Sequence, residues 1–254
     1  MKVRILGSSA HDAKHMQYTS SYIIDDVVAV DAGCLGTWGT PDDQQQVRAV
    51  FLTHSHVDHV GSLPLFVENV FTPDESCPVI YGHAETIESL RSSVFNDRIW
   101  PDFVRLSTPA VPFLRLEILE PEQPVTVFGL KVTPVLVDHV VPTFGYVIDG
   151  GACSVIFGGD SGPTKRLWEV ASKTENLRGV FLEAGFPNSM RWLAATSHHL
   201  TPELFAKEVA KIPDGTRIVA VHLKPRYRDE ITQELENLHI AALEIGECET
   251  DYVF

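Results

Sequence analysis

The stretch FLTHSHVDHVGSLPLF, residues 51–66, constrains the fold most because it sets polar and charged groups between two apolar runs. Four of its side chains are of types that bind metal ions: His54, His56, Asp58 and His59. The β-branched run Val50–Leu52 predicts a buried strand, and apolar residues at helical spacing begin near Gly61. The four side chains are therefore expected in a loop at the C-terminal end of a strand, where α/β folds commonly place their sites.

The spacing within this loop predicts two groups of ligands. Residues two apart in an extended segment point the same way, so His54 and His56 can bind one ion. Asp58 and His59 would then turn toward a neighbouring position. A structural zinc site closes with four ligands and commonly uses cysteine, whereas imidazole and carboxylate ligands suit hydrolytic zinc, iron or manganese. We therefore expect a hydrolytic metal site.

Three further residues of ligand type follow apolar runs elsewhere in the chain. His139 follows KVTPVLVD, Asp160 follows SVIFGG, and His222 follows RIVAV. Each is the first strong ligand after a predicted strand, so all three can converge with the histidine-rich loop on one edge of the sheets. An aspartate after a strand is often only a helix cap, but the three in this order, together with the loop, favour a metal centre.

The rest of the pattern predicts one mixed α/β domain over residues 1–254. Short apolar, β-branched runs predict strands at Val3–Leu6, Ser21–Ile24, Val27–Val30, Val50–Leu52, Val79–Tyr81, Leu114–Ile118, Lys131–Val137, Gly145–Ile148, Ser154–Phe157, Gly179–Leu182 and Arg217–Val221. Helical spacing predicts helices at Gly61–Glu68, Ala84–Phe95, Pro163–Ala171, Thr201–Lys211 and Arg226–Leu238, with Thr201 as an N-cap. Residues 96–125 are proline-dotted and aromatic, which favours an irregular insertion or an edge hairpin.

Charge and composition narrow the partners and the compartment. The chain has 20 Lys and Arg against 34 Asp and Glu, a net charge of −14. Such a surface repels polynucleotide phosphate, so a long nucleic acid is not expected, whereas a small anion drawn in by metal charge stays compatible with it. We expect no membrane span, since there is no run of about 18 apolar residues. The four cysteines form no CxxC pair, and the first residues, MKVRILGSSA, lack the longer apolar region of a signal peptide, so we expect a cytoplasmic protein.

Together these motifs resemble the metallo-β-lactamase superfamily: AVDAG (29–33), THSHVDH (53–59), His139, GGD (158–160) and His222. The resemblance implies an α/β fold, a four-layer αββα sandwich with two sheets face to face and helices outside. It also implies two divalent metal ions, zinc in the first place and iron or manganese as alternatives. The implied ligands are His54, His56 and His139 for one ion, Asp58, His59 and His222 for the other, and Asp160 as the bridge.

Two departures from other branches of this superfamily favour a hydrolase. Redox-type diiron members carry glutamate where this chain has His56. The β-lactamases use a cysteine where it has Asp160. Neither activity is therefore expected, and the ligand set is of the hydrolase type.

Four longer segments look like class II cyclic-nucleotide phosphodiesterases: HVVPTFGYVI (139–148), GGDSGPTKRLWE (158–169), FLEAGFPN (181–188) and LAATSHHLTPELFAKEV (193–209). Within them, Gly185 replaces the family's serine, Ser161 a threonine and His198 a glycine. The resemblance implies a phosphodiesterase that hydrolyses the 3′,5′-cyclic nucleotides cAMP or cGMP to 5′-monophosphates through a hydroxide that bridges the two ions. The implied partner is thus a small anionic nucleotide.

The same resemblance implies three catalytic residues. His199, in the HLTP element, would be the general acid that protonates the leaving 3′ oxygen. Glu183 would orient His199 and stabilise its charged form. Asp58 completes the catalytic set as well as serving as a ligand.

Several alternatives stay open at this point. The substrate could be another phosphodiester, such as a tRNA 3′ end, although the chain has no obvious basic, glycine-rich arm. A non-hydrolytic diiron protein that senses oxygen or redox state is a third reading, and a homodimer is open. His11 and His15 lie in a loop that could overhang the site, and Lys224 and Arg226 could contact phosphate or simply begin a helix.

Overall fold

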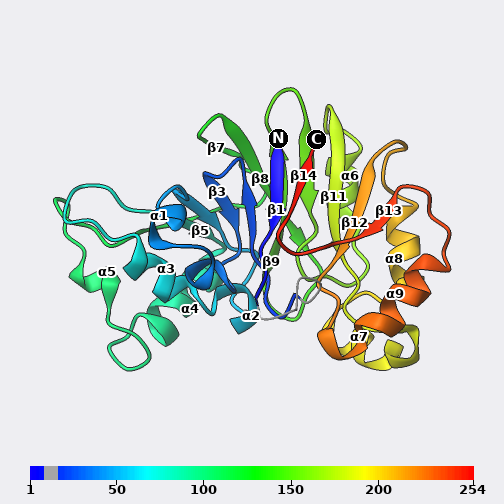
Figure 1. The fold of residues 1–254 in the computed structure, drawn as a ribbon, viewed down its shortest axis with the longest axis horizontal. Helices are drawn as coiled ribbons and strands as arrows, with labels where there is room; N and C mark the ends of the chain where they lie inside the picture. Colours follow the sequence, from blue (N-terminus) through cyan, green and yellow to red (C-terminus); the bar gives the residue numbers. More distant parts are fainter. Residues whose placement is uncertain (9–16) are drawn as a thin grey trace.

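The structure is a computed structural model that describes residues 1–8 and 17–254. Within these residues, two seven-stranded sheets face each other, and helices cover the outer face of each sheet (Figure 1). This is the four-layer αββα sandwich, so the predicted fold class is confirmed. No helix in the described part of the chain combines the length and the apolar character that a membrane crossing needs.

The first sheet has the strand order β14-β1-β2-β3-β4-β5-β6. Its strands are β1 (Lys2–Ile5), β2 (Tyr22–Ile24), β3 (Val28–Val30), β4 (Ala49–Phe51), β5 (Val79–Gly82), β6 (Arg115–Ile118) and β14 (Thr250–Val253). The pairs from β14 to β3 are antiparallel, and those from β3 to β6 are parallel. Asp25 and Asp26 form the expected tight turn between β2 and β3, both with positive φ.

The second sheet has the order β13-β12-β11-β10-β9-β8-β7. Its strands are β7 (Val125–Val127), β8 (Leu130–Val137), β9 (Thr143–Asp149), β10 (Ser154–Phe157), β11 (Leu177–Glu183), β12 (Arg217–Val221) and β13 (Leu243–Ile245). The pairs from β7 to β10 are antiparallel, and those from β10 to β13 are parallel. The parallel strands of each sheet therefore bring their C-terminal ends to the same edge.

The helices divide between the two outer layers (Figure 1). With the first sheet lie α1 (Pro41–Gln44), α2 (Val57–Val60), α3 (Leu63–Asn69), α4 (Ala84–Ser89) and α5 (Phe103–Leu106). With the second lie α6 (Arg166–Ala171), α7 (Arg191–Ser197), α8 (Pro202–Val209) and α9 (Arg228–Glu236). Short turns of 3-10 or π helix extend these layers at Leu35–Thr37, Leu90–Val94, Asn188–Met190 and Pro225–Tyr227.

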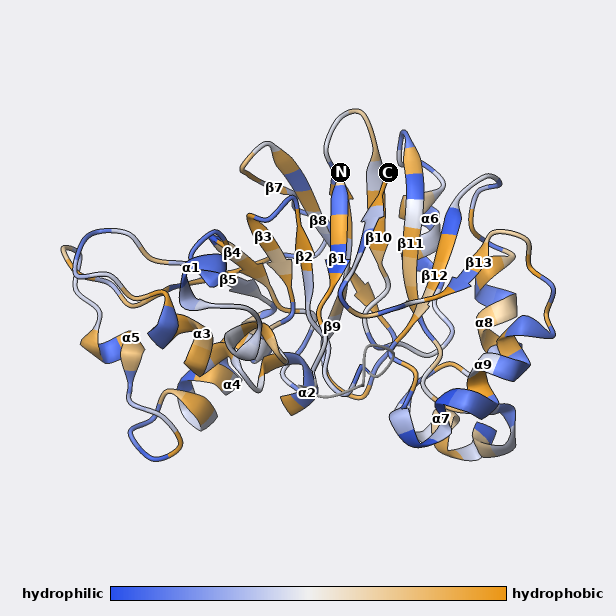
Figure 2. Ribbon diagram, viewed as in Figure 1, coloured by the Kyte–Doolittle hydropathy of each residue, from blue (hydrophilic) through white to orange (hydrophobic). Residues whose placement is uncertain are grey.

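Three apolar clusters hold the layers together, and strands such as β2 and β3 are coloured as hydrophobic in Figure 2, whereas β1 also carries hydrophilic segments. Between the sheets, rings such as Phe51, Tyr146 and Phe157 fill the central cluster. A second cluster joins the first sheet to its helices, and a third joins the second sheet to α6, α8 and α9. Strands buried on both faces need near-continuous apolar runs, which is why these runs were recognisable in the sequence.

Several local expectations need correction. Strands β7, β13 and β14 were not predicted, because they are short and only partly buried edge or near-edge strands. The ligand loop is extended only as far as His56, since Asp58 and His59 lie in the first turns of α2. Thr201 does precede α8, but its side chain makes no capping hydrogen bond. Residues 96–125 hold the short helix α5 and β6, which pairs in parallel with β5 and so is no hairpin.

Candidate metal centre

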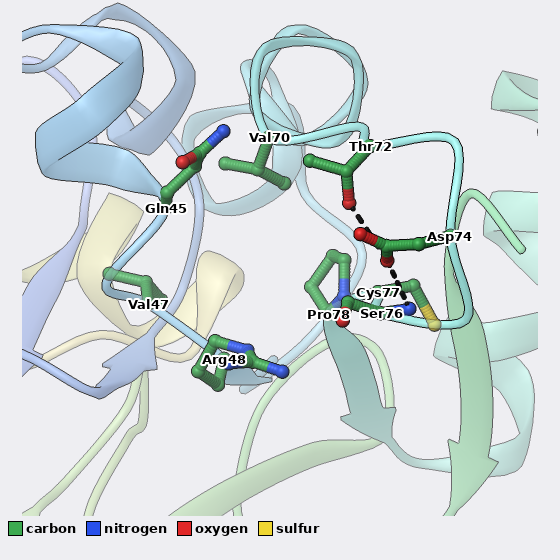
Figure 3. Close-up of a pocket in the computed structure, with 9 residues that line it drawn as sticks. All are labelled: Gln45, Val47, Arg48, Val70, Thr72, Asp74, Ser76, Cys77 and Pro78. Atoms are coloured by element: carbon green, nitrogen blue, oxygen red, sulfur yellow. Dashed lines mark hydrogen bonds between the residues drawn. The ribbon is translucent and has the colours of Figure 1, made fainter.

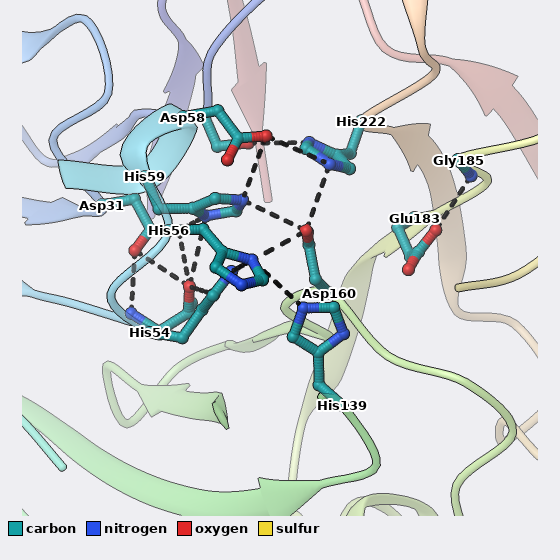
Figure 4. Close-up of polar contacts among 12 residues, drawn as sticks. Asp31, His54, His56, Asp58, His59, His139, Asp160, Glu183, Gly185 and His222 are labelled. Carbon is teal, nitrogen blue, oxygen red and sulfur yellow. Dashed lines mark hydrogen bonds and ion pairs between the residues drawn. The ribbon is translucent and has the colours of Figure 1, made fainter. Parts of the chain in front are cut away.

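The residues expected as ligands lie at the C-terminal ends of strands from both sheets (Figure 4). His54 follows β4 of the first sheet. His139, Asp160 and His222 follow β8, β10 and β12 of the second sheet. Because these strand ends share one edge of the sandwich, side chains far apart in the chain meet there.

The structure brings all seven expected ligand residues into two groups that share one aspartate: His54, His56, His139 and Asp160 form the first donor group, and Asp58, His59, His222 and Asp160 the second. In each group, one nitrogen or oxygen atom per residue lies within 4.8 Å of the others. The division follows the one expected from the spacing of the histidine-rich loop. The groups therefore satisfy the first geometric condition for two adjacent metal ions.

Hydrogen bonds determine where His54 carries its ring proton. Thr53 Oγ1 lies 3.0 and 2.9 Å from the two carboxylate oxygens of Asp31, so the hydroxyl donates its proton to Asp31. The hydroxyl oxygen can then accept the proton on Nδ1 of His54, 3.0 Å away. His54 is therefore protonated on Nδ1, and its Nε2 carries a lone pair.

His139 is held in the same tautomer. Its Nδ1 donates to the backbone carbonyl of His198 at 3.1 Å, which leaves a lone pair on Nε2. Nε2 of His54 and Nε2 of His139 both face Nδ1 of His56, at 2.9 and 3.4 Å. Ring nitrogens with converging lone pairs are the arrangement in which histidines bind a cation, each with its other ring nitrogen hydrogen-bonded.

The second donor group repeats this pattern. Nδ1 of His59 donates to Asp31 at 2.7 Å, and its Nε2 is buried without a hydrogen bond from any described residue. Nδ1 of His222 lies 3.0 Å from Oγ of Ser20, and Nε2 of His222 accepts from the Lys224 ammonium at 3.1 Å. In both rings Nε2 is therefore the nitrogen turned toward the donor group, which fits a divalent ion bound by imidazole and carboxylate.

Asp160 lies between the two donor groups, as Figure 4 shows. Its Oδ2 is 3.2 Å from Nε2 of His222, 3.3 Å from Nε2 of His59 and 3.9 Å from Nε2 of His54. Burial raises the pKa of Asp160, but His222 and His59 lower it more, so the pKa lies well below its usual value. An ionised carboxylate in this position can serve both groups.

The charges around the rings also favour a cation. Burial lowers the pKa of His59, but Asp160 and Asp31 raise it more, so the pKa lies well above its usual value. The two carboxylates thus attract positive charge to the buried ring. Burial and the neighbouring His59 hold the pKa of His54 well below its usual value, which keeps this ring neutral as a metal ligand must be.

Glu183, the last residue of β11, joins the segments next to the donor groups. Its carboxylate accepts hydrogen bonds from the backbone amides of Ser161 (2.9 Å), Gly185 (2.8 Å) and Leu200 (3.3 Å). It also accepts from Nδ1 of His199 at 2.6 Å. Four donors converge on a side chain that is only 1% exposed, so the orientation of the carboxylate is closely determined.

His199 is brought to Glu183 by the end of α7. His198 adopts left-handed φ and ψ there, and the chain reverses so that the buried His199 ring points its Nε2 toward Asp160 Oδ2, 4.0 Å away. Burial lowers the pKa of His199, but Glu183 raises it more, and the net shift is upward. Asp160, Glu183 and His199 are close enough to bind an ion, but the Glu183 oxygens are already occupied by amide donors. This arrangement instead fits proton donation from His199 Nε2.

Sequence reasoning missed the residues that orient the ligand histidines. Asp31 was quoted only as part of AVDAG, and Thr53, Ser20 and Gln17 were not singled out. Gln17 Oε1 accepts a hydrogen bond from the backbone amide of His222, a residue whose φ is positive. A polar residue directly after a predicted strand, as Asp31 is, was the one available signal. Ser20 and Gln17 contact His222 across 202 and 205 residues, and Thr53 contacts Asp31 across 22.

The other histidines that the structure describes take no direct part in the two donor groups. His198 is partly exposed, with its Nδ1 3.1 Å from the carboxylate of Asp138. It contributes only its backbone carbonyl, to His139. His11 and His15 lie outside the described residues.

A cavity of about 200 Å³ lies at the opposite end of the first sheet (Figure 3). Arg48 and Pro78, which precede β4 and β5, line it together with Asp74, whose carboxylate accepts from Thr72 and Ser76. None of the donor residues lines this cavity. The chemistry-bearing side chains therefore gather at the other edge of the sandwich.

Comparison with known proteins agrees with this geometry. The family model described as "Beta-lactamase superfamily domain" matches residues 35–223. The chain is similar to a Yersinia pestis protein named "Probable 3′,5′-cyclic-nucleotide phosphodiesterase", with 27% identity over 80% of this chain and 64% of that relative. It is also similar to "Ribonuclease BN" of Proteus mirabilis, with 24% identity over 81% of this chain and 77% of the relative.

Among solved structures, unliganded yeast PDE1 matches with a TM-score of 0.78 at 19% identity, over 98% of both chains. At this identity the match supports the fold alone. The chain spans a little under two thirds of the length of the Yersinia relative.

Proposed function

The chain belongs to the β-lactamase superfamily, and from this we propose that it is a metal-dependent phosphodiesterase that hydrolyses the 3′,5′-cyclic nucleotides cAMP or cGMP to 5′-monophosphates. The observation that carries this proposal is the buried His199–Glu183 pair, 2.6 Å apart, next to an aspartate shared by two donor groups. A two-ion site with an adjacent proton donor has what hydrolysis of a phosphodiester needs. The Yersinia relative named as a cyclic-nucleotide phosphodiesterase supports this substrate class.

In this proposal, zinc is the first choice of metal, with iron or manganese as alternatives. The first ion would be held by His54, His56 and His139, the second by Asp58, His59 and His222, and Asp160 would serve both. When bound, the ions supply positive charge for the phosphodiester oxygens and activate water for the attack.

The chain's own residues then orient the site and move the proton. Asp31 and Thr53 hold the donor histidines so that their lone pairs converge. His199, protonated on Nε2, would donate a proton to the leaving 3′ oxygen. Glu183 would keep the ring in the orientation for that transfer and stabilise its charged form, because three amides hold the carboxylate in place.

The nearest alternative substrate is a tRNA 3′ end, which the similarity to Ribonuclease BN supports. The net charge of −14 opposes it, because a long anionic substrate needs many Lys and Arg contacts. The same two-ion chemistry would serve both substrates, so the distinction lies in what binds outside the donor groups.

The test is purification with metal analysis, followed by assays on cAMP, cGMP, bis(p-nitrophenyl) phosphate and a tRNA precursor. We expect metal-dependent turnover of a cyclic nucleotide that chelation abolishes and added zinc restores. If the protein hydrolyses bis(p-nitrophenyl) phosphate but neither cAMP nor cGMP, the proposed substrate is wrong and the proposed phosphodiesterase reaction stands. If the purified protein contains iron, hydrolyses no diester and has a visible absorption band that changes with oxygen, the proposal that it is a hydrolase is wrong.

A further inference from the structure

Lys224 lies at the open side of the second donor group. Its ammonium nitrogen is 3.1 Å from Nε2 of His222 and 3.5 Å from Oδ2 of Asp58. Its side chain is about 30% exposed, so solvent and small solutes reach it. Its backbone amide donates to the carbonyl of Gly185 at 3.3 Å, which ties this position to the segment that follows Glu183.

Within the described part of the chain, Lys224 is the only lysine or arginine found in contact with either donor group. The other cations with ion pairs contact carboxylates elsewhere, as Arg166 does with Glu122. The charge of Lys224 also acts on His199, the proposed proton donor. It is thus a positive side chain in contact with the second donor group, and its charge extends to the proposed acid.

A purely structural ion pair does not account for this placement. Both Lys224 and Asp58 are about 30% exposed on their side chains, and ion pairs that water reaches in this way contribute little to stability. If Asp58 and His222 serve an ion, the two atoms that Lys224 now contacts are no longer available to it. Its ammonium would then need another anion at the same place.

We propose that Lys224 binds a non-bridging oxygen of the substrate's phosphoryl group. This inference rests on the proposed function, and it adds a substrate-binding residue that lies outside the metal ligands and the His199–Glu183 pair. A lysine ammonium is a compact charge with three donors, which suits a phosphoryl oxygen that shares its charge with a metal ion. It would also give an acidic protein a local attraction for a small anionic ester.

The test compares Lys224→Ala with Lys224→Arg and with Arg226→Ala. Arg226 lies two residues further along and is exposed. Arg226→Ala is the control, because it removes one positive charge from the same turn at a position that contacts no described donor residue. Three quantities are measured: zinc content and zinc affinity, affinity of the zinc-loaded protein for inorganic phosphate by calorimetry, and kcat and KM on bis(p-nitrophenyl) phosphate.

For Lys224→Ala we expect the zinc content to be unchanged. The affinity for phosphate should fall by about 10- to 100-fold, because one charge-assisted hydrogen bond is lost. KM should rise more than kcat falls, Lys224→Arg should keep part of the affinity, and Arg226→Ala should stay within about twofold of the parent. Unchanged phosphate affinity in Lys224→Ala would overturn the inference, and so would a loss of zinc. Phosphate binding is measured without a nucleotide, so it tests Lys224 even if no cyclic nucleotide is hydrolysed.

Discussion

Nδ1 of His199 lies 2.6 Å from Oε1 of Glu183 in a buried pair. His59 and Asp31 form a second buried histidine–carboxylate pair, at 2.7 Å. The two rings differ in what their other nitrogen faces: Nε2 of His59 is 3.3 Å from Asp160, within a donor group, whereas Nε2 of His199 is 4.0 Å from it. The same hydrogen-bonded arrangement thus suits one ring to metal binding and the other to proton transfer.

Replacing His199 by alanine tests the proton-transfer role. We expect turnover of a phosphodiester with a poor leaving group to fall by about 10²- to 10⁴-fold, the usual contribution of a general acid. Zinc content, measured by mass spectrometry of the dialysed protein, should not change, because His199 belongs to neither of the two four-residue donor groups. A loss of zinc would show that His199 is a ligand.

The leaving group provides the control for this experiment. p-Nitrophenolate departs without protonation, so bis(p-nitrophenyl) phosphate should be much less sensitive to His199→Ala than an alkyl diester is. Equal losses on both esters would contradict the acid role and indicate that the ring only positions other groups.

Replacing Asp160 by asparagine tests whether the two donor groups share this carboxylate. Because Oδ2 lies near ligand atoms of both groups, the affinity for both ions should fall. The decrease should exceed the ~10- to 100-fold that is typical when a hydrogen-bond partner of a ligand is lost. The measurement is a zinc titration that resolves two binding steps. His139→Ala is the matched control and should weaken one step only; a single weakened step in Asp160→Asn would show that it serves one ion.

Replacing Ser20 by alanine tests how a ligand ring is oriented. Ser20 Oγ is the hydrogen-bond partner of His222 Nδ1 at 3.0 Å, so its loss should weaken zinc binding in the second donor group by about 10- to 100-fold. Ser21 is the control, because its hydroxyl is equally buried and contacts no donor residue; it donates to the carbonyl of Ser20 and accepts from the amide of Cys34. Ser21→Ala should lower the free energy of unfolding and leave zinc affinity unchanged.

The candidate ligands and the mixed α/β class could be predicted for the same reason, whereas the four-layer sandwich was implied by the family resemblance. His54, Asp160 and His222 each come shortly after a strand that is buried on both faces, and such strands leave continuous apolar runs in the sequence. The edge strand β7 has no such run, because its residues are only half buried or exposed. The proposed roles of Glu183 and His199 came from a resemblance to a family and not from any local pattern.

The outer partners of the ligands could not be predicted, because they are defined only by distances in the folded chain. Ser20 and His222 are 202 residues apart in sequence, and Thr53 contacts Asp31 across 22. A serine or threonine in an apolar strand pattern is ordinarily unremarkable. Its function here is evident only once the ring nitrogens are assigned.

The Cys248 thiol predicts how stability changes with alkaline pH. Burial, with a smaller effect from Cys34, raises the pKa of Cys248 from 9.0 to about 12. Well below pH 9 the thiol is protonated in both the folded and the unfolded protein. Above pH 9 the thiol ionises first in the unfolded chain, so the free energy of unfolding decreases as the pH rises toward 12. Between pH 9 and pH 10 this amounts to about 1 kcal/mol. Urea unfolding of Cys248→Ala should show a correspondingly smaller decrease than the parent does; an equal decrease would assign the effect to other groups.

Gly33, the last residue of AVDAG, allows the ligand helix α2 to approach the first sheet. A Cβ at this position would lie 2.1 Å from the backbone carbonyl oxygen of Asp58 and 2.8 Å from Cβ of Thr19. Gly33→Ala must therefore displace the backbone that carries Asp58 and His59. We expect it to lower the free energy of unfolding by about 1–3 kcal/mol, the usual range for overpacking.

The displacement should also weaken zinc binding in the second donor group more than in the first. Gly82→Ala is the matched control, since its added Cβ would meet no atom closer than 3.4 Å and should leave zinc affinity unchanged. The measurements are urea unfolding and the two-step zinc titration on each variant. A Gly33→Ala protein with unchanged zinc affinity would mean that α2 can move without disturbing its ligands, and that the close approach serves packing alone.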